Sequence, residues 1–181
     1  MKNFIYNEMM THIPLCTHKD PKNVLIISTD AGGLIEEIQK HDDVSCDIIS
    51  SGDAIKGCED NNYDVVISEE GVEDAALLAH INRVLKDDGL LVSTHPSLDN
   101  KDQNKIAMQI LANYTKIIMP YNLGNGSTAI LASKSYHPTA DIILHRADML
   151  DNLDFYNCDI HIASFAMGNY IRKEYLGVIK N

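Results

Sequence analysis

The sequence predicts an α/β fold of the doubly wound type, in which helices cover both faces of a mostly parallel sheet. Short apolar runs alternate with segments of helical periodicity along most of the 181 residues. The runs are almost continuously apolar, which is typical of parallel strands buried on both faces. Residues that favour turns separate the segments. This alternation of strand and helix is the pattern of a Rossmann-like domain.

The expected elements follow the chain in that alternating order. Parallel strands are expected at residues 23–28, 46–50, 63–68 and 90–93, and a closing antiparallel hairpin at 114–119 and 128–132. Helices are expected at residues 34–40, 73–85 and 101–113 and over most of 159–180. Gly89 is expected to end the helix that begins at residue 73, in the left-handed conformation. No strand is expected between residues 53 and 63, so residues 1–181 should form one domain around a six-stranded sheet.

Composition and charge narrow the range of functions. A formal charge of −11 argues against a nucleic-acid partner, because phosphate binding needs a basic face. The charge suits a cationic ligand, although acidity also serves solubility. The four cysteines are widely spaced, as expected of reduced thiols in a cytoplasmic protein, and the histidines show no metal-binding spacing. No apolar run approaches the length of a membrane span, so no membrane partner is expected.

Small and acidic residues follow the carboxyl ends of the expected strands, where open α/β sheets bind their ligands. They are Asp30, Gly32 and Gly33 after the first strand, Ser51 and Asp53 after the second, and Glu69 and Glu70 after the third. Carboxylates gathered at one edge can hold ammonium groups and accept protons. Each acid also has a structural alternative, because Asp30 can cap the following helix and Glu70 can complement a helix dipole.

Five blocks of sequence carry a resemblance to a known family. They read Phe4-Ile-Tyr-Asn-Glu-Met-Met-Thr-His12, Pro14-Leu-Cys-Thr-His-Lys-Asp-Pro-Lys-Asn-Val-Leu-Ile-Ile27, Tyr63-Asp-Val-Val-Ile67, Leu131-Ala-Ser-Lys134 and Phe155-Tyr-Asn-Cys-Asp-Ile-His-Ile-Ala-Ser-Phe165. The residues in these blocks, and the order of the blocks along the chain, resemble those of the spermidine synthase family of aminopropyltransferases. The resemblance covers nearly the whole chain and implies a methyltransferase-like Rossmann fold.

The sequence departs from the family pattern at several positions. Family members carry a β-rich domain ahead of the first block, where this chain starts. The family turn G-G-G-D-G-G reads Ser28-Thr-Asp-Ala-Gly-Gly33 here, so Ala31 stands at the aspartate that contacts the aminopropyl end of the nucleoside. Ser51 stands at the acid that holds the ribose. The catalytic loop D-S-S-D-P becomes Glu69-Glu-Gly-Val-Glu-Asp74, with Val72 among its altered positions.

The resemblance implies roles for the residues that match. Glu69 is the expected catalytic base. Asp30, Gly32, Gly33, Ser51 and Asp53 are the expected nucleoside contacts, and Tyr6, Glu70 and Tyr121 the expected amine contacts. The resemblance implies no permanently bound cofactor, and decarboxylated S-adenosylmethionine is the expected co-substrate.

Three functions stay open at this point. The first is aminopropyl transfer from decarboxylated S-adenosylmethionine to putrescine, in polyamine biosynthesis. The second is a shortened, inactive relative that acts as a binding or partner subunit, which the altered acids favour. The third is a methyltransferase that uses S-adenosylmethionine, which only the fold favours. A homodimer is also expected, through an exposed opening segment or through the hairpin face.

Overall fold

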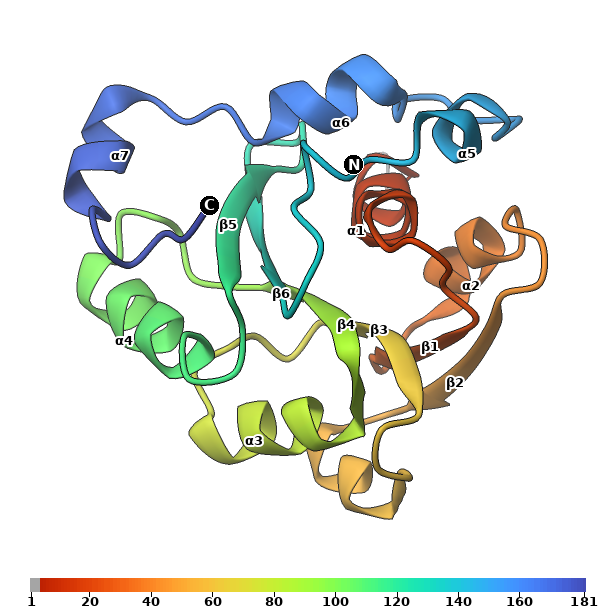
Figure 1. The fold of residues 1–181 in the computed structure, drawn as a ribbon, viewed down its shortest axis with the longest axis horizontal. Coiled ribbons are helices and arrows are strands. Elements are labelled where there is room, and N and C mark those ends of the chain that lie inside the picture. Colours follow the sequence, from red (N-terminus) through yellow and green to blue (C-terminus); the bar gives the residue numbers. More distant parts are fainter. Residues whose placement is uncertain (1–3) are drawn as a thin grey trace.

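A computed structural model describes residues 4–181 and has a six-stranded sheet at its centre, as expected (Figure 1). The strand order is β2-β1-β3-β4-β6-β5. The strands are β1 (Asn23–Ile27), β2 (Ser45–Ile49), β3 (Tyr63–Ser68), β4 (Leu85–Thr94), β5 (Ile117–Asn122) and β6 (Thr128–Ser133). Strands β2, β1, β3 and β4 are parallel to one another, while β6 runs antiparallel to both β4 and β5. The predicted doubly wound, methyltransferase-like fold is confirmed.

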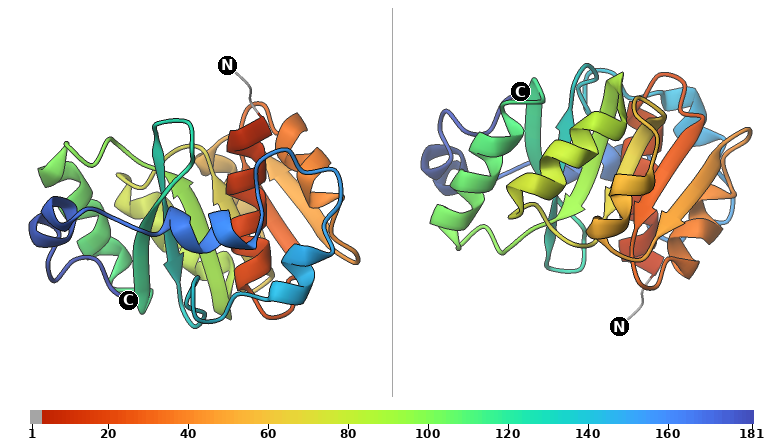
Figure 2. Two further views of the ribbon diagram at one scale, coloured as in Figure 1. Left: turned by 90° about the horizontal axis from the view of Figure 1, so that it is seen from above. Right: turned by 90° about the horizontal axis from the view of Figure 1, so that it is seen from below.

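Helices cover both faces of this sheet, as the two views of Figure 2 show. The α-helices are α1 (Phe4–Thr17), α2 (Gly32–Ile38), α3 (Ala75–Val84), α4 (Lys101–Leu111), α5 (Leu144–Asp148), α6 (Cys158–Ser164) and α7 (Asn169–Glu174), and η1 (Gly52–Gly57) is a 3₁₀ helix. Helices α1, α2, α5 and α6 lie on one face, and α3, α4 and η1 on the other. No helix within residues 4–181 is long and apolar enough to cross a membrane.

Strand β1 shows why the apolar runs predict this architecture. Val24 and Ile26 pack with α1 and α2, while Leu25 and Ile27 pack with α3 and α4, and all four are fully buried. Alternate residues of a strand point to opposite faces, so a strand with helices on both faces needs apolar residues throughout. The six residues of β3 are buried in the same way.

The opening segment differs from the expectation that it is exposed. It forms α1, and its residues from Glu8 to Thr17 are all buried. Helix α1 packs closely against α2 on one face of the sheet. The prediction of an exposed opening segment is therefore wrong, and this segment has no spare surface beyond its first turn for a partner to cover.

Gly89 also differs from the expectation. It is not among the glycines with a positive φ angle, and it lies within β4, which already begins at Leu85. Helix α3 ends at Val84 instead, and Leu85 has extended backbone angles. The absence of an extra strand is confirmed, because the described residues between 53 and 63 hold only the end of η1 and a turn.

Candidate active site

The carboxyl ends of β1 and β3 lie side by side and bring Ser28 next to Glu69. The Ser28 hydroxyl donates a hydrogen bond to the Glu69 carboxylate and accepts one from the backbone N–H of Asp30, at 3.0 Å. The Glu69 backbone is also fixed, because its N–H donates to the carbonyl of Ile27 at 2.9 Å and its carbonyl accepts from the Thr94 hydroxyl at 3.1 Å. The expected base therefore has a well-defined position at the edge of the sheet.

Tyr6 approaches the same carboxylate from the first turn of α1. Its side chain is partly buried. The pKa of the Tyr6 phenol is raised well above its ordinary value, mainly by burial and to a smaller extent by a hydrogen bond to the Glu69 carboxylate. The phenol therefore keeps its proton at neutral pH and can act as a hydrogen-bond donor beside an acceptor.

The second glycine of the turn, Gly33, lies against α1. A Cβ atom on Gly33 would stand 2.0 Å from Nδ2 of Asn7, so the Asn7 amide occupies the space that glycine leaves. Asp30 is exposed at the start of this turn. The N-cap of α2 is Ala31, and no side chain caps that helix. The structural alternative for Asp30, capping α2, is therefore not observed.

A second group of expected residues lines an open hollow beside η1, with a volume of about 220 Å³. The Glu70 carboxylate accepts a hydrogen bond from the backbone N–H of Gly52 at 2.8 Å and so ties the β3 end to η1. Asp53 is exposed, and its carboxylate forms an ion pair with the Lys56 ammonium at 3.2 Å. Ser51 stands at the N-cap position of η1, but its side chain makes no capping hydrogen bond. Ser51, Asp53 and Glu70 all border this hollow.

Tyr121 differs from the other expected site residues, because its side chain is fully buried. Its hydroxyl lies 3.4 Å from the carbonyl oxygen of Met9, and its ring packs 5.2 Å from that of Phe165. A ligand has no access to it in this conformation. Its role in substrate binding stays a prediction, and its observed contacts are those of a core residue.

Sequence reasoning missed Asn7 and Ser28. Asn7 sits next to Tyr6 in the first sequence block, at the position where the family has histidine or glutamine, so the signal was present. Ser28 occupies the first position of the glycine turn, and no pattern along the chain indicated that it would meet Glu69 forty-one residues later. The structure thus brings together a carboxylate, a protonated phenol, an amide and the glycine turn that begins α2.

Comparison with known proteins shows what this chain resembles in sequence and fold. The model of the spermine/spermidine synthase domain matches residues 3–59. The polyamine aminopropyltransferase of Clostridium beijerinckii is 27% identical, over 93% of this chain and 77% of the relative. That of Thermotoga maritima is 26% identical, over 94% and 74%. The crystal structure of spermidine synthase from Thermotoga maritima superposes with a TM-score of 0.81 at 25% identity, again over 94% and 74%.

The chain is thus similar in sequence and fold to the spermidine synthase family. A spermidine synthase solved with the transition-state analogue AdoDATO has the same fold, with a TM-score of 0.81 at 24% identity over 94% of this chain and 73% of that one. Against the family pattern, Ala31 is 8% exposed and offers only a methyl group, and Val72 is fully buried. At these two positions the family pattern has an acid, and neither Ala31 nor Val72 can supply a carboxylate.

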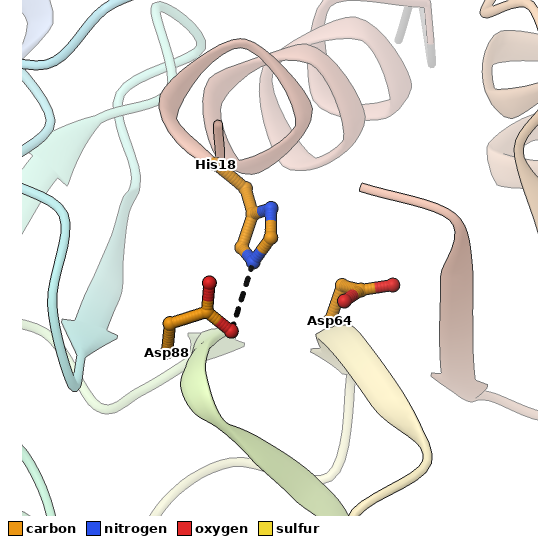
Figure 3. A group of neighbouring side chains, drawn as sticks. All are labelled: His18, Asp64 and Asp88. Carbon is orange, nitrogen blue, oxygen red and sulfur yellow. Dashed lines mark ion pairs between the residues drawn. The ribbon is translucent and has the colours of Figure 1, made fainter. Parts of the chain in front are cut away.

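At the other end of the central strands, near the starts of β3 and β4, His18, Asp64 and Asp88 form the one group of possible metal ligands found within the described residues (Figure 3). Asp64 accepts hydrogen bonds from the backbone N–H groups of Lys22 and Asn23 and from the Lys86 ammonium, at 2.8–2.9 Å. These donors satisfy and neutralise the carboxylate.

The histidine of this group is likewise not free for a metal ion. His18 Nδ1 accepts from the backbone N–H of Asp20 at 3.2 Å, which puts the ring proton on Nε2, the atom that faces Asp88 at 3.7 Å. A metal ion would need the lone pair of that nitrogen. We therefore assign these three side chains to the contact that joins α1, β3 and β4, and not to a metal site.

Proposed function

We propose that the protein is an aminopropyltransferase of the spermidine synthase type, which transfers an aminopropyl group from decarboxylated S-adenosylmethionine to putrescine in polyamine biosynthesis. The observation that carries the proposal is the Glu69 carboxylate at the end of β3, held by Ser28 beside the protonated Tyr6. The names of the relatives support the reaction class. The free cysteines are in keeping with a cytoplasmic protein.

In the proposed reaction, the nucleoside lies along the Gly32–Gly33 turn, with Asp30 at its aminopropyl end and Ser51 and Asp53 at its ribose. A neutral amine nitrogen attacks the carbon next to the sulfonium. The new C–N bond forms as the C–S bond breaks, and the electron pair of that bond neutralises the sulfur to give methylthioadenosine. The attacking nitrogen then carries an extra proton, which Glu69 accepts.

The acids around the turn also favour a decarboxylated nucleoside over S-adenosylmethionine. The carboxylate of S-adenosylmethionine would face Asp30 and Glu69, and like charges at short range weaken binding. The amino group of the decarboxylated nucleoside meets the same acids with favourable sign. Glu70 and Tyr6 are the proposed partners of the diamine, whose distal ammonium needs an acceptor.

The deciding experiment combines calorimetry with an assay of spermidine formation. Decarboxylated S-adenosylmethionine and methylthioadenosine should bind more tightly than S-adenosylmethionine. Glu69→Gln should lower kcat by about a hundredfold or more and leave nucleoside affinity within about threefold, because it removes the proton acceptor and keeps the shape. Glu36→Gln, on an exposed residue of α2, is the matched control and should change neither.

A second candidate is an inactive relative that acts as a binding or partner subunit. Ala31 favours it, because a methyl group stands where the family pattern has an acid, and one charge-assisted hydrogen bond is worth about 1.5–3 kcal/mol. If none of the three nucleosides binds at millimolar concentration, the enzyme proposal is wrong and the inactive relative is favoured. Tight binding of S-adenosylmethionine alone would favour a methyltransferase instead.

A further inference from the structure

The structure pairs two residues that differ from the family pattern. Glu69 is one methylene longer than the aspartate of the family loop, and Ser28 brings a hydroxyl to a turn position where the family has glycine. The two side chains are hydrogen-bonded to each other. We propose that Ser28 is the positioning residue for Glu69, because its hydroxyl holds the Oε2 atom of the longer carboxylate and so fixes where that carboxylate meets the substrate proton. This inference rests on the proposed function of Glu69.

The direction of the Ser28 hydroxyl is fixed by its surroundings. Ser28 is 5% exposed, so water has little access to it. Its oxygen accepts the backbone N–H of Asp30 at 3.0 Å, which leaves its proton for another acceptor. The Oε2 atom of Glu69 is that acceptor. A hydroxyl held on one side by the backbone and donating on the other is a rigid anchor, since its own rotation would break one of the two bonds.

The anchor acts on the only part of Glu69 that is free to move. Its backbone is held by Ile27 on β1 and by Thr94 on β4, so the side-chain torsions alone decide where the carboxylate lies. An added methylene moves a carboxylate by about one C–C bond, roughly 1.5 Å. A misplacement of that size in a reacting group can lower a rate about a hundredfold. Drawing Oε2 back toward β1 offsets the added length.

The first experiment compares turnover in a set of variants. Ser28→Ala should lower kcat about tenfold and leave the KM for the nucleoside within about twofold, because the carboxylate loses its anchor while the nucleoside keeps its contacts. Ser28→Thr keeps the hydroxyl and should recover most of the rate. Ser135→Ala, an exposed serine just beyond β6, is the matched control and should behave as the wild type.

A double-variant cycle separates positioning from a general loss of structure. In Glu69→Asp the shorter carboxylate no longer reaches the hydroxyl. Adding Ser28→Ala to that variant should therefore cost less than about twofold, against about tenfold in the wild type. Equal losses in the two backgrounds would mean that Ser28 acts on something other than Glu69.

An NMR measurement at a single pH tests the inference without turnover. The signal of the Glu69 carboxyl carbon is assigned by its loss in Glu69→Gln. Ser28→Ala should move this signal, because the carboxylate loses a hydrogen-bond donor, and Ser135→Ala should leave it unchanged. A wild-type protein that makes no spermidine contradicts the proposed function, while an unmoved signal in Ser28→Ala overturns the role of Ser28.

Discussion

At the scale of single residues, Glu8 shows how a charge can be buried beside the candidate site. It is 2% exposed. Its carboxylate accepts the backbone N–H groups of Asp154, Phe155 and Tyr156 at 3.0, 2.9 and 2.7 Å. A buried carboxylate is tolerated only where hydrogen bonds replace its water, and here three donors do so. Glu8 therefore ties α1, which carries Tyr6 and Asn7, to the segment ahead of α6.

Replacing this carboxylate should destabilise the whole protein. We expect Glu8→Ala to lower the free energy of unfolding by about 3 kcal/mol, because three backbone donors lose their acceptor. Urea denaturation monitored by circular dichroism measures the change. Glu36→Ala, on the exposed face of α2, should alter it by less than about 0.5 kcal/mol. If the two variants unfold at the same urea concentration, Glu8 does not hold the segment in place.

Tyr121 marks the limit of what the sequence predicts about single residues. The predicted hairpin strand ended at Met119 and left Tyr121 in the loop, whereas Tyr121 lies within β5. The direction of its side chain depends on its packing against α1 and Phe165. Those contacts come from segments more than forty residues away on either side. Asp30, Gly33 and Glu69 were easier to locate, because the carboxyl ends of neighbouring parallel strands meet at one edge.

At the scale of whole elements, the strands follow from the sequence and α1 does not. A strand buried on both faces must be apolar throughout, and β1 and β3 could be recognised on that ground. Helix α1 is buried almost all round, so it lacks the one-sided stripe that identifies a surface helix, and Pro14 lies within it. Its helical form is stabilised by packing against α2 and the sheet, which no local pattern records.

The contact between α1 and α2 contains a buried chain of polar side chains. His12 Nδ1 lies 2.9 Å from His41 Nε2, and His12 Nε2 lies 2.8 Å from the Glu37 carboxylate. Burial lowers the pKa of His12, and it lowers the pKa of His41 to about 3. Burial similarly lowers the pKa of His161, on α6, to about 4. His41 and His161 are therefore neutral in the folded protein at mildly acidic pH.

This arrangement predicts a loss of stability in acid. Below the ordinary histidine pKa of about 6.5, the unfolded chain binds protons that the folded protein does not, so unfolding becomes easier as the pH falls. Stability should be complete above pH 6.5 and should fall toward pH 4, by about 1.4 kcal/mol per pH unit for each such histidine. Urea denaturation at a series of pH values measures the slope.

Two variants check the assignment of that slope. His41→Gln removes one of the buried imidazoles. The slope of the free energy of unfolding against pH should then decrease by the contribution of one histidine. His145→Gln changes an exposed histidine on α5 and should leave the slope as it is. A wild-type stability that stays constant between pH 7 and pH 5 would contradict the prediction.

At the scale of the whole molecule, exposed apolar side chains gather beside the hairpin. Tyr170 and Leu176, on and just after α7, are 73% and 86% exposed. Leu176 lines an open hollow of about 210 Å³ whose other walls are mainly apolar side chains, among them Met119 and Pro120 of β5. Contiguous apolar surface of this kind is typical of an interface. Of the two faces considered for a homodimer, the hairpin face is the one with such a surface, because most of α1 is buried.

We expect a homodimer that uses this hairpin face. Sedimentation at tens of micromolar should then give the mass of two chains, since an interface of micromolar affinity is filled at that concentration. Leu176→Glu should shift the protein to the monomer, because it puts a charge into the apolar contact. Met149→Glu is the matched control, because it puts the same charge on another exposed apolar residue. Met149 lies just after α5 and is 68% exposed, so this variant should leave the dimer intact. A wild-type protein that sediments as a monomer would contradict the prediction, and a dimer unaffected by Leu176→Glu would mean that another face joins the two chains.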